Sequence, residues 1–384
     1  MSDDSAAQRR PPPPIPLTVL TGFLGAGKTT LLNRLLKDPA LNETAVIINE
    51  FGDVSLDHLL VEYVGDNMVL LQSGCLCCTM RGDLVDALET LLRDLDARRC
   101  KFSRVLLETT GLADPAPVLH TAMVHPYLLL RYRLDGVVTV VDAVNGTATL
   151  DAHAEAVKQA AVADRIVLSK TDLANAEQRA AILERLHALN PAAPILDAAK
   201  GEASPERLLN CGLYDPTRKI PDVKKWLAEE AYADAQAHRH HGHDHGHADE
   251  HIHLDRNRHD DHIASFVLTS DVAIPAGTLE MFLELVRANY GSQLLRVKGI
   301  VKLAEMPDTP VVVHGVQHVF HPTARLERWP DEDHRTRIVF ITRDLPERTV
   351  RELFEAFIGA AAPDRPDRQA LTDNPLVPFG GVDR

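Results

Sequence analysis

The chain has 384 residues, of which 45% are hydrophobic, so it can bury a sizeable core in two or three domains of about 150 residues each. Its formal charge of −14 and the lack of a basic stripe argue against nucleic acid and anionic lipid as partners. No stretch offers the ~18 consecutive apolar residues of a membrane helix, and no segment resembles a signal peptide. We therefore expect a soluble, cytoplasmic protein with no membrane partner.

A short leader and an alternating α/β region make up the first half of the chain. Residues 1–14 contain four successive prolines, and we expect them to form a disordered leader. From residue 15 onward, short β-branched runs alternate with helical patterns, which is typical of parallel strands joined by crossover helices. The expected fold over residues 15–225 is an α/β domain with a doubly wound, mostly parallel sheet. Its strands are expected at residues 17–20, 45–49, 68–71, 104–108, 137–142, 165–169 and 195–197, and helices at 31–36 and 83–95.

The first functional motif follows the first strand directly. Residues 22–29 read GFLGAGKT and fit the P-loop pattern, with helically spaced leucines immediately after them. Glycines let the backbone amides wrap the phosphates, while Lys28 is expected to reach the β- and γ-phosphates and Thr29 to bind Mg²⁺. The motif and its strand–loop–helix context together predict a nucleoside triphosphate site in a P-loop fold.

Two acidic residues follow the second expected strand. Residues 49–53 read NEFGD, at the place where a GTPase keeps its first switch, so Glu50 or Asp53 could lend an oxygen ligand to a metal. Alternatively, both are solvated acidic residues of a loop.

Cys100 and Cys211 have no other cysteine near them in the sequence, and we expect both to be structural.

Three of the five cysteines crowd into residues 74–78, which read GCLCC and follow the third expected strand. This position predicts a turn on the nucleotide side of the sheet. Soft thiolates from Cys75, Cys77 and Cys78 can converge on Zn²⁺ or Co²⁺ and leave a fourth position to a carboxylate, water or partner. The alternatives are ordinary buried cysteines, or a vicinal disulfide between Cys77 and Cys78.

The residues 108–111 read ETTG and follow an apolar strand, so Glu108 should emerge where the sheet meets the phosphates. We expect Glu108 to share the Mg²⁺ shell with Thr29, and the amide of Gly111 to sense the γ-phosphate. Asp142 also ends an apolar strand and is the rival of Glu108 as a Mg²⁺ ligand. The alternative role of Asp142 is a helix cap or turn residue. No glutamine or arginine stands out as the residue that orients the attacking water, so the catalytic residue is unassigned and slow turnover is expected. The next helix is expected to start at Asp114-Pro115.

Residues 169–172 read SKTD and end a late strand, where P-loop GTPases keep the loop that reads the base. Asp172 would accept hydrogen bonds from the ring N–H and the exocyclic amine of guanine, whereas adenine would leave this carboxylate poorly paired. GTP is therefore favoured, although the tetrapeptide alone would also suit an ordinary turn. The expected nucleotide ligands are Gly22, Gly25, Ala26, Gly27, Lys28, Thr29, Thr30, Gly111, Ser169, Lys170 and Asp172.

The composition changes abruptly after Trp226, and residues 226–262 are expected to be a flexible linker rich in histidine. Imidazole groups are mostly neutral at neutral pH, so the linker should bind divalent metals as a buffer or capture tract. Alternatively, this segment only connects the two domains, and its histidines have no function in metal binding. The auxiliary metal ligands expected in it are His238, His240, His241, His243, His245, His247, His251 and His253.

A second structural pattern begins at residue 263. It suits a small α+β domain of ferredoxin-like type over residues 263–360, followed by a tail over 361–384. The expected elements are strands at 263–269, 294–303, 311–319 and 337–342, and helices at 279–288 and 346–358.

Together these motifs resemble the CobW family of P-loop GTPases, which includes zinc-regulated metallochaperones, cobalamin-synthesis proteins and nitrile hydratase activators. The resemblance covers nearly the whole chain, and it implies a slow GTPase that loads Zn²⁺ or Co²⁺ at the three clustered cysteines and delivers it to a client metalloprotein. Ser169 stands where many GTPases have Asn, so the contact of this residue is open. The segments that carry the resemblance are residues 22–29, 49–52, 74–78, 108–115, 169–172, the histidine-rich linker and 296–299.

The leading hypothesis for function is that Mg²⁺ and GTP order the segments around Glu50 and Gly111 and thereby control the metal at the cysteines. One alternative is a passive metal buffer, in which the histidine tract binds the metal and the GTPase site is vestigial. Another is a signalling GTPase that uses the metal only structurally. The sequence leaves open the metal used in the cell, the client, and whether the protein forms a homodimer.

Overall fold

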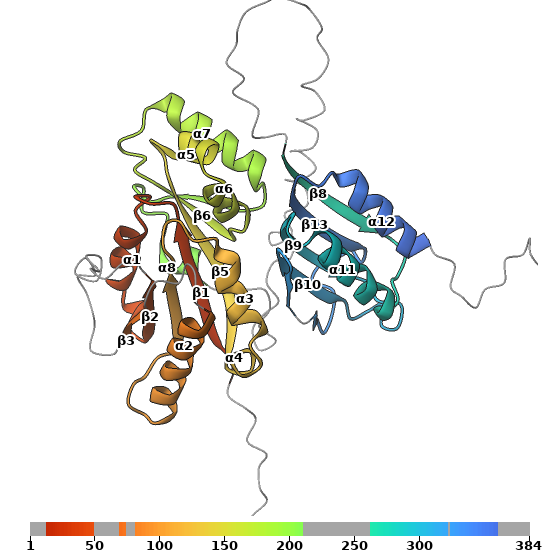
Figure 1. Cartoon of the computed structure of the whole chain (residues 1–384), viewed down its shortest axis with the longest axis horizontal. Helices are drawn as coiled ribbons and strands as arrows, with labels where there is room; N and C mark the ends of the chain where they lie inside the picture. The colour runs from red at the N-terminus through yellow and green to blue at the C-terminus, as the bar shows by residue number, and fades with distance from the viewer. Residues whose placement is uncertain (1–12, 50–68, 74–80, 210–261, 322, 360–384) are drawn as a thin grey trace, which may run out of the picture.

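The computed structural model describes residues 13–49, 69–73, 81–209, 262–321 and 323–359 of the chain. These residues form two β-sheets, each with its own helices, which lie side by side (Figure 1). We call residues 13–209 the N-terminal part and residues 262–359 the C-terminal part. Among the helices of the described residues, none is both long and apolar enough to cross a lipid bilayer.

The first sheet has seven parallel strands in the order β3-β2-β4-β1-β5-β6-β7, which confirms the expected α/β fold. All seven expected strands are present, and β5 starts five residues earlier than expected because its first residues pair with the start of β1. The strands are β1 (Ile15–Gly22), β2 (Thr44–Asn49), β3 (Val69–Ser73), β4 (Arg104–Glu108), β5 (Tyr132–Asp142), β6 (Arg165–Ser169) and β7 (Ile195–Asp197).

Helices cover both faces of this sheet, as parallel strands that are buried on both sides require. Alternate residues of β1 show the division, since Val19 packs with α2 and α3 while Leu20 packs with α1 on the opposite face. The helices are α1 (Lys28–Leu36), η1 (Pro39–Leu41), α2 (Arg81–Asp96), α3 (Pro115–Val124), α4 (Pro126–Arg131), α5 (Gly146–Ala152), α6 (Ala154–Ala161), α7 (Ala176–Leu189) and α8 (Pro205–Leu208).

The second sheet is antiparallel, with strand order β11-β10-β9-β13-β8 and β12 paired to β10. The single strand expected at residues 311–319 is instead the hairpin β10–β11, because Gln317 adopts a left-handed backbone with φ of 52° and reverses the chain. The second helix follows the last long strand rather than preceding it, so the end of this unit departs from the β-α-β-β-α-β order of ferredoxin-like domains. Its elements are β8 (Ile263–Ser270), α11 (Ala276–Tyr290), β9 (Leu294–Val301), β10 (Val311–Val316), β11 (Val319–Phe320), β12 (Ala324–Arg325), β13 (Thr336–Arg343) and α12 (Glu347–Gly359).

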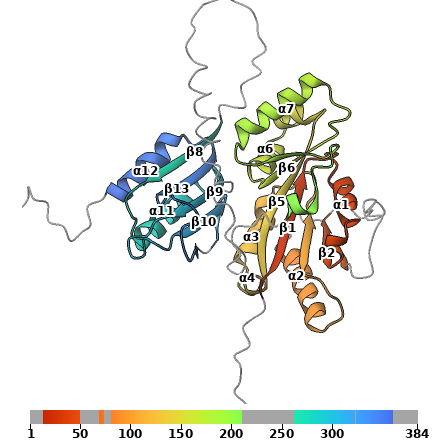
Figure 2. The same ribbon diagram turned by 180° about the vertical axis from the view of Figure 1, so that it is seen from behind.

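The two faces of the second sheet have different partners. Helices α11 and α12 cover the outer face, and both Figure 1 and the reverse view in Figure 2 place them away from the first sheet. The inner face packs against the N-terminal part, where Ile300 and Val312 share one apolar cluster with Ala160 of α6 and Leu186 of α7. The helix α6 therefore lies between the two sheets.

Candidate functional site

The loop between β1 and α1 has the backbone of a phosphate cradle. Gly25 and Gly27 have φ of 72° and 96°, values that favour glycine, and the left-handed Gly27 is the N-cap of α1. The ammonium group of Lys28 donates to the carbonyls of Gly22 at 3.0 Å and Phe23 at 3.3 Å, so it lies across the mouth of its own loop. The glycines and the lysine thus have the arrangement that the motif predicts.

Two expected Mg²⁺ ligands lie next to each other. The hydroxyl of Thr29, in the first turn of α1, donates to Glu108 Oε1 at 3.0 Å, and Glu108 is 5% exposed at the end of β4. The rival acid, Asp142, is occupied elsewhere: its Oδ1 accepts the N–H groups of Val144 and Asn145. Asp142 is therefore a turn residue, in line with its alternative reading.

The segment after Glu108 lies against the P-loop. Thr109 Oγ1 donates to Thr21 Oγ1 at 2.8 Å, which ties the segment to the end of β1. At Gly111 an added Cβ would lie 2.6 Å from the backbone nitrogen of Leu24, so the close approach requires glycine. The residue expected to sense the γ-phosphate is thus in contact with the loop expected to hold the phosphates.

The base-reading loop is also tied to the P-loop. The hydroxyl of Ser169, which stands where many GTPases have Asn, donates to the carbonyl of Ala26 at 2.6 Å. Lys170 has a left-handed backbone with φ of 56°, and its ammonium group contacts Asp142 Oδ2 at 2.7 Å. Asp172 is exposed, where an incoming base could meet it. The structure brings these residues together with the P-loop, and their roles toward guanine stay predictions.

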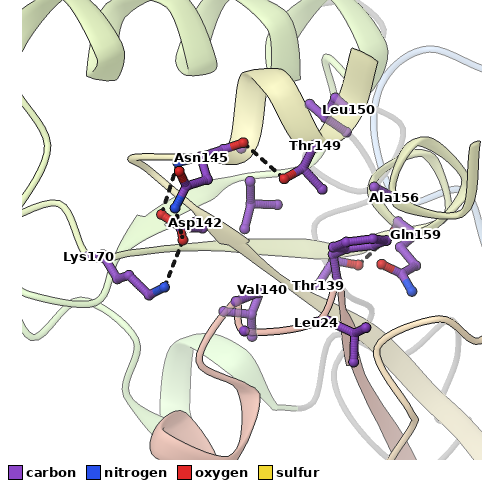
Figure 3. Close-up of a pocket in the computed structure, with 15 residues that line it drawn as sticks. Leu24, Thr139, Val140, Asp142, Asn145, Thr149, Leu150, Ala156, Gln159 and Lys170 are labelled. Carbon is purple, nitrogen blue, oxygen red and sulfur yellow. Dashed lines mark hydrogen bonds and ion pairs between the residues drawn. The ribbon is translucent and has the colours of Figure 1, made fainter. Parts of the chain in front are cut away.

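A cavity of about 200 Å³ adjoins the P-loop (Figure 3). Asp142, Asn145 and Lys170 form a hydrogen-bonded group at one end of it, and Leu24 and Gln159 lie at the other. The cavity therefore extends from the base-reading loop to Gln159 of α6. It is lined by Phe23, Leu24, Gly25, Ala26, Thr139, Val140, Val141, Asp142, Asn145, Gly146, Thr149, Leu150, Ala156, Gln159 and Lys170.

Two neighbouring side chains of α6, which the sequence did not single out, contact the segment that follows Glu108. Gln159 Nε2 donates to the carbonyls of Gly111 and Ala113, and Lys158 Nζ contacts Asp114 Oδ2 at 2.7 Å. The available signal in the sequence was a glutamine within the alanine-rich buried face of a short helix. That signal identifies a buried polar side chain, but it does not identify the distant segment that this side chain contacts.

Asp114 joins three elements at the start of α3. Its carboxylate caps the helix through the N–H of Ala116 at 3.0 Å, and it also accepts Lys158 of α6 and the amide of Gln317 from the β10–β11 turn. Burial raises the pKa of Asp114, but the hydrogen bonds from these three donors outweigh burial and hold the pKa below its ordinary value. The carboxylate is therefore stably charged.

The expected transition-metal ligands Cys75, Cys77, Cys78, Glu50 and Asp53 lie outside the described residues. Residues 226–261, which contain the expected histidine ligands, also lie outside, and so does Cys211. Within the described residues no group of three or more His, Cys, Asp or Glu side chains could hold a metal ion. Cys100 is a free, partly buried thiol whose pKa is raised by burial, which agrees with a structural role.

Both parts of the chain match known protein families. Residues 16–197 match the family model described as "CobW/HypB/UreG, nucleotide-binding domain", and residues 263–358 match "Cobalamin synthesis protein cobW C-terminal domain". The two matches correspond to the two sheets.

Similar proteins extend over most of the chain. The zinc chaperone YjiA of Escherichia coli is 33% identical over 342 residues, which cover 89% of this chain and 98% of the relative. The zinc chaperone CobW of a Sinorhizobium species is 30% identical and covers 90% and 97% of the two chains. A crystal structure described as Zn(II)-bound YjiA GTPase from E. coli has a TM-score of 0.63 and 29% identity, with coverage of 90% and 99%.

Proposed function

This chain belongs to the CobW family of P-loop GTPases, and we propose that it hydrolyses GTP in order to bind a transition metal and deliver it to a client metalloprotein. The GTPase activity is that of its family, whose members include relatives named as GTPases. Zn²⁺ is the favoured cargo, because relatives are named zinc chaperones and thiolates bind Zn²⁺ well; Co²⁺ is the next candidate.

The nucleotide site supports the GTPase part of this proposal. Lys28 closes the P-loop, and the oxygens of Thr29 and Glu108, 3.0 Å apart, are hard ligands of the kind that Mg²⁺ prefers. Mg²⁺, when bound with GTP, would neutralise charge on the β- and γ-phosphates. Asp172 would select guanine by accepting two N–H donors.

The observation that carries the link between metal and nucleotide is the register of three strands. Gln72 of β3 pairs with Ile48 of β2, which pairs with Glu108 of β4. Neighbouring strands are ~4.8 Å apart, so the end of β3 lies roughly 10 Å from the strand that ends at Glu108. The chain enters its Gly-Cys-Leu-Cys-Cys sequence one residue after β3 ends at Ser73.

This placement supports control of the metal by GTP. The γ-phosphate would order the segment around Gly111, and a metal bound by Cys75, Cys77 and Cys78, which follow β3 in the chain, would respond. A fourth coordination position, open or lent by Glu50 or Asp53, suits transfer to a client better than permanent storage.

The test is a titration with Co²⁺, whose thiolate complexes are coloured, and with Zn²⁺ in competition. Affinity is measured with a non-hydrolysable GTP analogue, with GDP and without nucleotide, for the full chain. We expect affinity to differ between the GTP and GDP states, because only the γ-phosphate can reach Gly111. Equal affinities in all three states would remove control by GTP from the proposal.

Cys77→Ser should abolish the coloured thiolate site and leave GDP binding intact. Its matched control is Cys100→Ser, a half-buried lone thiol in the same part of the chain, which should bind Co²⁺ like the wild type. Deletion of residues 238–253 separates the buffer alternative: if that deletion removes all metal binding, the cysteine site is not the functional one.

A further inference from the structure

We propose that Gln159 is a positioning residue for GTP hydrolysis, because its side-chain amide holds the backbone of the segment that contains Gly111. This inference rests on the proposed role of Gly111 as the residue that meets the γ-phosphate. It assigns to α6 a part in the reaction that neither the P-loop nor the Mg²⁺ ligands supply.

The first support is the geometry of the amide. Gln159 is 1% exposed, and its Nε2 donates to the carbonyl of Gly111 at 3.2 Å and to that of Ala113 at 3.0 Å. Two acceptors at one nitrogen fix the orientation of the amide, because the flipped group would place its oxygen against two carbonyl oxygens. One side chain therefore holds two peptide units of the same segment.

The second support is that α6 is itself held in place. Thr139 of β5 donates its hydroxyl to the backbone carbonyl of Gln159 at 2.7 Å, and both groups are buried. His153, at the N-cap of α6, stacks on Phe23 of the P-loop with ring centroids 4.4 Å apart. The helix is thus attached to the sheet and to the P-loop, so a side chain that extends from it has a fixed origin.

The third support is that Gly111 is confined from the other side. The backbone of Leu24 lies where a Cβ of Gly111 would be, with the nearest approach at 2.6 Å. Figure 3 shows Leu24 and Gln159 at the same end of the cavity. With the P-loop on one side of Gly111 and the Gln159 amide on its carbonyl, the peptide unit between Gly111 and Leu112 has little freedom to rotate, and this restricts the backbone next to the Gly111 N–H.

The reaction gives this restraint its importance. Phosphoryl transfer depends on groups that are already in place when charge develops on the γ-phosphate. Loss of the Gln159 donor would leave the Gly111 and Ala113 carbonyls without that partner and let the segment relax. GDP lacks the γ-phosphate, so its binding does not depend on this restraint.

The test compares Gln159→Met, which keeps the length of the side chain and removes its donor, with the wild-type full chain. We expect kcat for GTP to fall about tenfold, as the loss of roughly one net hydrogen bond predicts. We expect the Kd for GDP and the KM for GTP to change by less than about twofold, which corresponds to a change of less than about 0.5 kcal/mol in the free energy of binding.

Asn190→Leu is the matched control. Asn190 is 2% exposed, and its side-chain nitrogen donates to the carbonyls of Ala160, Ala161 and Ala163, at and just beyond the C-terminal end of α6. This substitution removes a comparable amide, which comes from the C-cap of α7 and contacts α6, without touching the Gly111 segment. It should lower Tm and leave kcat unchanged, so an equal fall of kcat in both variants would mean general loosening of α6 and would overturn the inference.

A second variant keeps the inference testable if Gln159→Met does not fold. In Gln159→Glu, an ionised carboxylate opposes two carbonyls, whereas the protonated acid can donate one hydrogen bond. The rate of this variant relative to the wild type should rise as the pH is lowered, and a ratio independent of pH would contradict the inference. Absence of GTP hydrolysis in the wild type would instead count against the proposed function.

Discussion

Ser169 donates its hydroxyl to the carbonyl of Ala26, so the loop expected to read the base and the loop expected to hold the phosphates are joined by a 2.6 Å hydrogen bond. The same hydroxyl lies 3.2 Å from the carbonyl of Val141, at the end of β5. A single small side chain at the end of β6 thus connects to the end of β5 and to the P-loop. Loss of its hydroxyl should therefore loosen the base-reading loop.

We therefore expect Ser169→Ala to weaken GDP binding about fivefold to tenfold, corresponding to ~1 kcal/mol for one buried hydrogen bond. The measurement is the Kd of a fluorescent GDP analogue. Ser265→Ala is the matched control, because Ser265 is also buried and donates to the Leu189 carbonyl, away from the nucleotide. An unchanged Kd in Ser169→Ala would show that the hydroxyl does not support the base-reading loop.

At the scale of elements, the start of α3 depends on the carboxylate of Asp114. The sequence predicted this N-cap and the following proline, and the structure confirms both. The same carboxylate also accepts Lys158 from α6 and Gln317 from the β10–β11 turn. The cap of one helix is thus the point where a second helix and the C-terminal part meet the segment that carries Gly111.

Asp114→Ala should lower the free energy of unfolding by about 2 kcal/mol, since N-cap loss costs ~1 kcal/mol and the partners of the carboxylate are lost as well. Asn175→Ala, which removes the capping box of α7, is the matched control for loss of a cap alone. Chemical unfolding curves of the two variants give the difference. Equal decreases in the free energy of unfolding would show that the contacts of Asp114 with Lys158 and Gln317 do not stabilise the fold beyond the effect of the cap.

The wild-type chain should also show the charge of Asp114 in its pH dependence. The pKa is lower in the folded chain than the ordinary value of 3.8, so the unfolded chain binds more protons at acidic pH. The stabilisation from Asp114 is therefore present above this value and is lost as the pH falls through the folded pKa. In Asp114→Asn, the free energy of unfolding should therefore depend less on pH in this acidic range, which chemical unfolding at several pH values measures.

Most elements were predictable because their signals are local. The seven strands of the first sheet follow from apolar runs, and α2 follows from the spacing of its leucines. The sequence also predicted that the P-loop, the Glu108 segment and the Ser169 loop lie close together, because the carboxyl ends of parallel strands meet at one edge of the sheet. Gln159 and Gln317 were missed, since their partners are 48 and 203 residues away and no local pattern encodes such a contact.

At the scale of the whole molecule, a buried ionic cluster lies between the two parts of the chain. Asp164 Oδ1 accepts Arg296 and, at 2.8 Å, Lys298 from β9, and its Oδ2 accepts the N–H of Val137 at 2.9 Å. Burial raises the pKa of Asp164, but the two cations outweigh burial and lower it. Residues 296–299, one of the segments that carry the resemblance to the CobW family, thus provide ion pairs across the interface.

We expect Asp164→Ala to cost about 3–5 kcal/mol, because it leaves two buried cations without their counter-ion. Asp135→Ala is the control, since Asp135 is a buried partner of Arg104 within the N-terminal part alone. Small-angle X-ray scattering should report an expanded molecule for Asp164→Ala and not for Asp135→Ala. A compact, fully stable Asp164→Ala protein would show that the cluster does not hold the two parts together.

The packed interface also fixes the two points between which the intervening chain must run, residue 209 at the end of the first part and residue 262 at the start of the second. When both ends of a flexible segment without contacts of its own are fixed, its length affects stability through the entropy of closing a loop, which changes by about 0.6 kcal/mol per doubling of length. If residues 226–262 form the flexible linker that the sequence predicts, their number can vary with almost no change in the stability of the two parts. Evolution or an engineer could then lengthen or shorten this linker, and with it the number of imidazole groups, at almost no cost to folding.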